Sequence, residues 1–306
     1  MPLKSLAAPL LAAAMLSGLA GCSRQSSAPA APAKPAASAA AAAPESSAAA
    51  AAPHPASDYA PLMQVVFGTA YRAAQEDAVT DLPDPDQPGH KMHMALSAVD
   101  MQALPSGDTV LVVSGQHANA DGDADSAHVD SGYLSLYLLR QEGKQWKLVR
   151  RHDNVASLGS SGNIGELRWI ELAAGKPGIA MLHGGVWQGY TITLLSLFDP
   201  SAAEVRDLAG AIPVHSDNEG GCGPSTKKCW QAEAAWRFEP AATASGYDDL
   251  VLTFSGEERT ARSAPASPDQ NEDVERETRP FNGSARYVYE RGAYHLREGV
   301  NPVPGI

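Results

Sequence analysis

The stretch Met92-His-Met-Ala-Leu-Ser-Ala-Val-Asp-Met101 is followed by the turn-forming residues Pro105-Ser-Gly-Asp108 and then by Thr109-Val-Leu-Val-Val-Ser114. Both outer runs repeat with a period near two and are rich in residues typical of strands. Strands joined by so short a turn must pair antiparallel, because parallel neighbours need a crossover of about a dozen residues or more. The stretch therefore predicts an antiparallel sheet.

The same pattern continues to the end of the chain. Short runs rich in Val, Leu, Tyr and Trp are each bounded by Gly, Pro, Asp or Ser, which is typical of strands and tight turns. The further predicted strands are 133–140, 146–151, 167–172, 179–183, 190–198, 232–238, 249–254, 286–289 and 293–296. We expect a mainly β fold, either an antiparallel β-sandwich or a curved meander. A β-propeller-like arrangement is the alternative, favoured only by Asp-rich fragments at 119–123 and 247–251.

One helix is expected before the strands. Asp58 can cap it, and Pro61 is tolerated in a first turn. Apolar residues follow at helical spacing, namely Leu62, Val65, Val66, Ala70 and Ala73. The pattern predicts a helix from about Tyr59 to Ala78 that packs on a sheet.

The N-terminus has a different composition. Lys4 precedes an apolar run, 6–19. The last residue of this run begins the sequence Leu19-Ala20-Gly21-Cys22. These four residues resemble the lipobox of bacterial lipoproteins. The resemblance implies that 1–21 is a cleaved signal peptide, that Cys22 carries three acyl chains, and that the chain is anchored stably in a membrane. Ser23 is similar to the sorting signal for the outer membrane, so we expect a cell-envelope protein facing the periplasm.

Residues 22–57 are almost entirely Ala, Pro and Ser. The prolines prevent a long helix, so the segment is expected to be a disordered tether. As a coil it would span roughly 30 to 35 Å. The remainder, 58–306, has the length of a single β-rich domain. Its mixed-charge stretch 256–283, with Pro265 and Pro280, is expected to be a disordered loop.

The net charge of −12, with no Lys/Arg cluster, argues against nucleic acid as a partner. It also argues against a polybasic contact with anionic lipid, so attachment would depend on Cys22. The other cysteines, Cys222 and Cys229, are expected to form a disulfide in an oxidising compartment. The alternative is a Cys/Cys/His metal site with His215, although six intervening residues exceed the usual zinc spacing.

The acidic loop, residues 117–131, lies between the predicted strands 109–114 and 133–140 and is a candidate calcium site. Its oxygen-bearing residues fall at alternate positions and at the twelfth position, as in calcium loops. The candidate ligands are Asn119, Asp121, Asp123, Asp125 and Asp130. However, Ala124 stands where such loops have glycine. A solvated hairpin loop with ordinary turn residues is the alternative, and apart from possible calcium we expect no cofactor.

The segment His90-Lys-Met-His-Met94 supplies imidazole and thioether groups that bind soft metals such as copper. The candidate ligands are His90, Met92, His93 and Met94. On a strand, however, Met92 and Met94 would share one face and His93 the other, which favours a core role for the methionines.

A catalytic set is harder to find. His183-Gly-Gly185 is similar to the oxyanion loop of lipases, but the sequence has no G-x-S-x-G nucleophile motif. We therefore expect a non-enzymatic binding or structural lipoprotein whose exposed Trp187 and Tyr190 contact an envelope protein or a glycan. The alternatives are a calcium- or metal-dependent hydrolase that uses the acidic loop, and a soft-metal binding protein.

Overall fold

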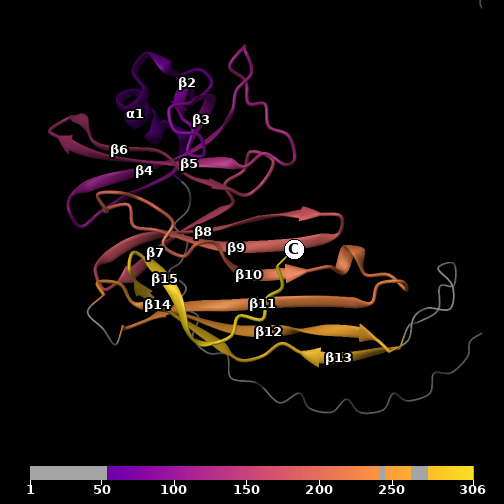
Figure 1. Ribbon diagram of the computed structural model, residues 1–306. Coiled ribbons are helices and arrows are strands. Elements are labelled where there is room, and N and C mark those ends of the chain that lie inside the picture. The colour runs from indigo at the N-terminus through magenta and orange to yellow at the C-terminus, as the bar shows by residue number, and fades with distance from the viewer. Residues whose placement is uncertain (1–53, 242–244, 263–274, 306) are drawn as a thin grey trace, which may run out of the picture. The chain divides into compact units, whose positions relative to one another are not determined.

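The computed structural model describes residues 54–241, 245–262 and 275–305 (Figure 1). All described residues belong to one compact unit. The predicted signal peptide, Cys22 and most of the predicted tether lie outside the described residues. No helix in the described ranges is both long and apolar enough to span a membrane.

The N-terminal helix is shorter than predicted. Helix α1 spans Ala56–Phe67 and buries Leu62 and Met63. It ends at Gly68, whose φ of 56° departs from helical geometry. The following residues, predicted to be helical up to Ala78, instead form a 3₁₀ turn, the short strand β1 (Tyr71–Arg72) and the start of β2 (Asp77–Pro83). The helix prediction is therefore wrong beyond Phe67.

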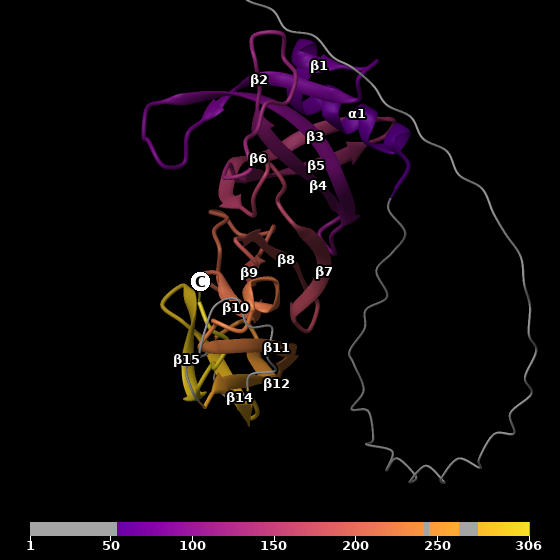
Figure 2. The same cartoon turned by 90° about the vertical axis from the view of Figure 1, so that its right-hand side faces the viewer.

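Six antiparallel strands form the first sheet in chain order, β1-β2-β3-β4-β5-β6. After β1 and β2 come β3 (Lys91–Ala103), β4 (Asp108–His117), β5 (Gly132–Glu142) and β6 (Gln145–Leu158). Strands β3 and β4 pair antiparallel across the Pro105-Ser-Gly-Asp108 turn, with Met101 opposite Leu111. Helix α1 lies against this sheet (Figure 2).

Nine strands form the second sheet, in the order β15-β14-β12-β11-β10-β9-β8-β7, with β13 paired to β12. The first half contains β7 (Glu166–Ala173), β8 (Lys176–Trp187), β9 (Tyr190–Phe198) and β10 (Ile212–Asp217). The second half contains β11 (Lys228–Glu239), β12 (Asp249–Ala261), β13 (Arg276–Pro280), β14 (Ser284–Glu290) and β15 (Ala293–Gly299). A short 3₁₀ helix, η2 (Glu219–Gly221), precedes β11.

These sheets confirm the mainly β antiparallel fold with one N-terminal helix. In the described residues the first sheet is a meander, and the second is one except that β14 pairs with β12 past β13; neither shows the repeated blades of the propeller-like alternative. The loop predicted over 256–283 differs from the structure at both ends. Strand β12 continues to Ala261 and pairs with β13, for example Glu257 with Pro280. Backbone pairing prevails there over polar composition, while residues 263–274 lie outside the described part.

Three hydrophobic clusters make up the core. One lies between α1 and the first sheet and includes Leu62 and Tyr137. Another joins the two sheets, because it contains Val110 of β4 together with Ile179 of β8. The third lies within the second sheet. The shared cluster packs the two sheets on each other, as a sandwich requires.

Candidate binding surface

The hairpin of β8 and β9 positions the two aromatic residues predicted to bind a partner. Trp187 and Tyr190 are paired across the turn Gln188-Gly189, whose φ values are 48° and 83°. Two positive φ values are typical of the type I′ turns that match the twist of a hairpin. A Cβ atom on Gly189 would lie 2.4 Å from the carbonyl carbon of Gly220, so the turn sits directly on η2. The tip of the hairpin is thus held in place.

Tyr190 faces inward from this tip. Its ring lies 5.6 Å from that of Trp230, centroid to centroid. The Trp230 indole N–H donates to Ser216 Oγ at 3.1 Å, and the Trp230 backbone N–H donates to Asn218 Oδ1 at 2.7 Å. Tyr190 is half-buried, so it supports the hairpin more than it offers a contact surface.

The predicted disulfide lies next to Trp230, which packs against Tyr190. Cys222 and Cys229 are joined, with their Cα atoms 5.6 Å apart, and Cys229 is fully buried. His215, the third ligand of the alternative metal site, instead places Nε2 3.0 Å from Asp217 Oδ2. The disulfide joins the end of η2, on which Gly189 rests, to the start of β11 next to Trp230. It therefore braces the same hairpin.

Trp187 remains accessible, with 54% of its surface exposed. Its indole stacks on the imidazole of His128 at a centroid distance of 6.1 Å and an interplanar angle of 16°. The same imidazole places Nε2 3.1 Å from the carbonyl oxygen of Val186 and Nδ1 3.2 Å from Ser161 Oγ. Val186 itself is 55% exposed. Two neighbouring apolar side chains are thus presented to solvent, one on each face of β8.

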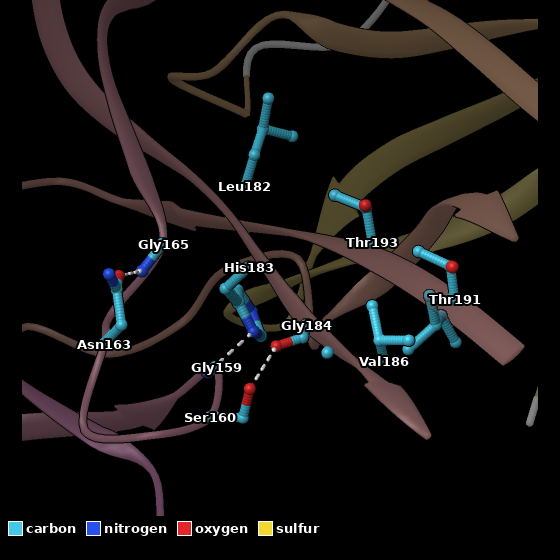
Figure 3. A pocket seen from close by; sticks show the side chains of 12 residues that line it. Gly159, Ser160, Asn163, Gly165, Leu182, His183, Gly184, Val186, Thr191 and Thr193 are labelled. Atoms are coloured by element: carbon cyan, nitrogen blue, oxygen red, sulfur yellow. Dashed lines mark hydrogen bonds between the residues drawn. The ribbon is translucent and has the colours of Figure 1, made fainter. Parts of the chain in front are cut away.

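A groove of about 310 Å³ lies along the hairpin and is lined in part by Val186 (Figure 3). One wall is the segment 159–165, which contributes Ser160 and Asn163. The other wall is the β8–β9 hairpin, with Gly184 from β8 and Thr191 from β9. The lining contains hydroxyl, amide, glycine and aliphatic groups and no Asp, Glu, Lys or Arg side chain. We call Val186, Trp187, His128 and this groove the hairpin surface.

His183 lies at the floor of the groove and is 7% exposed. Its Nδ1 accepts the Gly159 N–H at 3.3 Å, so Nε2 donates to Ser196 Oγ at 2.8 Å. The Ser196 hydroxyl in turn donates to Asp207 Oδ2 at 2.8 Å. Burial lowers the pKa of His183, an effect that the Asp207 carboxylate partly offsets.

This buried chain orders the three side chains as His–Ser–Asp, with the serine in the middle. The imidazole donates to Ser196 and therefore does not act as the base of a serine–histidine pair, and the fully buried Ser196 hydroxyl is not presented to a substrate. Asp207 also accepts the backbone N–H groups of Leu197, Ala209 and Ala211 at 2.9 to 3.0 Å. The chain therefore fixes the β9–β10 connection, and His183-Gly-Gly185 is a structural element.

The structure does not assemble the predicted calcium ligands. Asn119 Oδ1 accepts the N–H groups of Asp121 and Asp123 at 2.9 and 3.0 Å, as in an Asx turn. Asp130 Oδ2 accepts the Ala127 N–H at 2.7 Å. The Asp121, Asp123 and Asp125 side chains are exposed. Among the residues that the structure describes, no three His, Cys, Asp or Glu side chains are grouped to hold a metal ion.

The soft-metal ligand set is also divided. Met92 and Met94 are buried in the core beneath α1, whereas His90 and His93 are exposed. His93 Nδ1 lies 2.9 Å from Asp81 Oδ1 on the neighbouring strand. Successive strand residues point to opposite faces, so the set predicted from His90 to Met94 cannot converge. The structure therefore does not bring the four predicted soft-metal ligands together.

The sequence indicated Trp187 and Tyr190, but His128 and the groove were missed. Val186 adjoins Trp187 at a turn, and two consecutive apolar residues there were a usable signal. His128 comes from a loop of the other sheet, so no local pattern connects it to the hairpin.

Comparison of the chain with protein-family models, curated proteins and solved structures finds no match to any of them.

Proposed function

We propose that this protein is a lipid-anchored lipoprotein of the cell envelope, attached through acylated Cys22 to the outer membrane on its periplasmic side. Its function is to bind an envelope partner, without catalysis, through the hairpin surface. The observation that supports the binding role is the exposure of Trp187 and Val186, 54% and 55%, on a backbone that is fixed from both sides.

The position and support of these two residues favour binding. Exposed aromatic and aliphatic side chains that adjoin a groove are typical of interaction sites, and tryptophan is among the residues that contribute most to interfaces. The type I′ turn, the contact of Gly189 with η2 and the His128 stack all reduce the entropy that binding would otherwise cost. The Ala/Pro/Ser segment 22–57 would let the domain reach a partner some distance from the membrane.

The hydrolase alternative has less support. The acidic loop uses Asn119 and Asp130 to shape its own backbone, and its exposed carboxylates do not gather. The buried Ser196 is not placed as a nucleophile. A binding protein needs neither group to react.

The anchor predicts a change in localisation on substitution of one residue. Cells expressing the full-length chain with Cys22→Ser should incorporate no alkyne-labelled fatty acid into it, and the protein should move from the membrane pellet to the soluble fraction. The reason is that acyl chains supply about 0.8 kcal/mol per buried methylene, and the described residues contain no helix that is long and apolar enough to replace them. A matched Ser23→Ala variant should stay labelled and membrane-bound. Equal labelling of both variants would contradict the anchor.

The hairpin surface predicts protection of Trp187 in the envelope. Hydroxyl-radical footprinting of the full-length protein should oxidise Trp187 several-fold less in intact envelopes than after purification in detergent, because a bound partner covers the indole. Trp146, which lies on β6 away from the hairpin, serves as the matched indole and should react equally in both samples. Equal oxidation of Trp187 in both samples would refute binding at this surface.

A further inference from the structure

One edge of β8 has no neighbouring strand over its last residues. Strand β7 starts at Glu166, which pairs with Leu182. From His183 to Trp187, β8 pairs only with β9 in the described part of the chain. The groove lies along this stretch, between the edge and the segment 159–165.

The turn geometry determines which backbone groups face the groove side of the edge. In a two-residue hairpin the residues that flank the turn, here Trp187 and Tyr190, exchange hydrogen bonds, and the pairing alternates from there. Gly184 and Val186 therefore point their N–H and C=O groups away from β9. Two contacts agree with this, since Ser160 Oγ donates to the Gly184 carbonyl at 3.3 Å and His128 Nε2 lies 3.1 Å from the Val186 carbonyl.

Proteins protect exposed edges with proline, charged side chains, bulges or a covering loop. The stretch 183–187 reads His-Gly-Gly-Val-Trp, and the groove lining carries no charged side chain. The outward carbonyls of this edge are contacted by two side chains, those of Ser160 and His128. Each carbonyl oxygen can accept a second hydrogen bond. Val186 and Trp187 point to opposite faces of the strand, so they would contact an added strand from both sides.

We propose that the edge of β8 from Gly184 to Trp187 binds an extended polypeptide segment of the partner by strand addition. The inference rests on the binding role proposed above. The segment inside the groove is uncharged, because the groove offers no opposite charge. Its flanks are basic, since the loop that contributes His128 also exposes Asp121, Asp123 and Asp125, and the chain carries a net charge of −12. The same charge disfavours a second copy of the chain as the occupant.

A linear peptide library tests this directly. Phage displaying random decapeptides are selected on the full-length protein in detergent, in parallel with the variants Val186→Pro, Val186→Thr and Trp187→Ala. Proline removes the outward N–H of residue 186, whereas threonine keeps both the N–H and the β-branched shape. Peptides with an uncharged alternating centre and Lys/Arg flanks should be enriched on the wild type and Val186→Thr, and their binding should fall at least tenfold on Val186→Pro.

Amide hydrogen exchange keeps the test valid if Val186→Pro fails to fold. On the wild type, a synthetic copy of an enriched peptide should slow exchange of the Gly184 and Val186 amides at least tenfold. The Gly185 amide, which faces β9, should change little. N-methylation of the alternate peptide amides that face β8 should abolish binding. N-methylation of the other alternate amides, which point away from β8, should leave binding unchanged.

The remaining outcomes separate the two proposals. Enrichment that survives Val186→Pro but is lost in Trp187→Ala would overturn strand addition while leaving the hairpin surface as a binding site. Binding of soluble cell-wall glycan fragments that depends on Trp187 and not on residue 186 would do the same. A failure to enrich any peptide would overturn strand addition, and protection of Trp187 in the envelope would still decide the proposed function.

Discussion

Replacing Asp207 with alanine is expected to lower the free energy of unfolding by about 3 kcal/mol or more. The carboxylate accepts the Ser196 hydroxyl and the backbone N–H groups of Leu197, Ala209 and Ala211. Alanine would leave these donors unpaired beside a core where Ser196 and Leu197 are fully buried. Each unsatisfied buried donor costs about 1 to 3 kcal/mol, reduced where water enters.

Urea unfolding of the full-length protein in detergent, monitored by tryptophan fluorescence, measures the change. Asp125→Ala is the matched control, because Asp125 is exposed on the acidic loop and should alter stability by less than about 0.5 kcal/mol. Asp207→Asn should recover part of the loss, since its amide oxygen can still accept. Similar midpoints for Asp207→Ala and Asp125→Ala would show that the carboxylate does not organise the β9–β10 connection.

The second large effect is expected where α1 meets the first sheet. The hydroxyl of fully buried Tyr137 donates to Asp153 Oδ1 at 2.7 Å, and Arg151 Nε donates to Asp153 Oδ2 at 2.7 Å. Arg151 Nη1 also donates to the Val66 carbonyl near the end of α1 at 3.1 Å, and its guanidinium lies over the Phe67 ring. Asp153→Ala should therefore cost about 2 to 4 kcal/mol.

Lys147→Ala is the control for Asp153→Ala. It removes the exposed pair with Glu142 and should cost less than about 1 kcal/mol. Chemical unfolding of both variants gives the comparison, and equal stabilities would show that the contacts of Asp153 with Tyr137 and Arg151 do not hold α1 on the sheet.

The same tyrosine makes stability depend on alkaline pH. Burial, and then the neighbouring Asp153 carboxylate, raise the pKa of Tyr137 well above its usual range. Between about pH 10 and that raised pKa the unfolded state loses the phenolic proton while the folded state keeps it. The unfolding free energy should therefore be unaffected by this group below about pH 10 and fall as the pH rises further. Tyr137→Phe should flatten the fall, which urea titrations at pH 9 to 11 would measure.

The sequence was sufficient for the fold because its signals were local. Alternating runs such as 133–140 and tight turns such as Glu142-Gly-Lys144 predict strand pairs without long-range information, and β5 and β6 pair as expected. The helix was extended too far because Ala70 and Ala73 continue the apolar spacing, whereas Gly68 and the pairing of Arg72 with Asp77 end it. Strand β13 was missed because its polar sequence resembles a loop and only pairing with β12 makes it a strand.

The candidate site was predicted only in part. An exposed Trp187 could be proposed because it lies beside Gln188-Gly189 at a turn. Its stack on His128 depends on the packing of two sheets, and the groove depends on where β7 stops, neither of which leaves a periodic pattern. The spacing from Asn119 to Asp130 also fits ordinary turns, and in the structure Asn119 and Asp130 accept backbone N–H groups within the loop.

Site-specific photo-crosslinking in cells tests the central claim most directly. A benzophenone amino acid is placed at position 187 of the full-length chain and, in a second strain, at position 149 of β6, where Val149 is 44% exposed. Binding through the hairpin surface predicts a discrete crosslinked species from position 187 that is absent from position 149. No adduct at position 187, or the same adducts from both positions, would contradict the claim that the β8–β9 hairpin is where this protein binds.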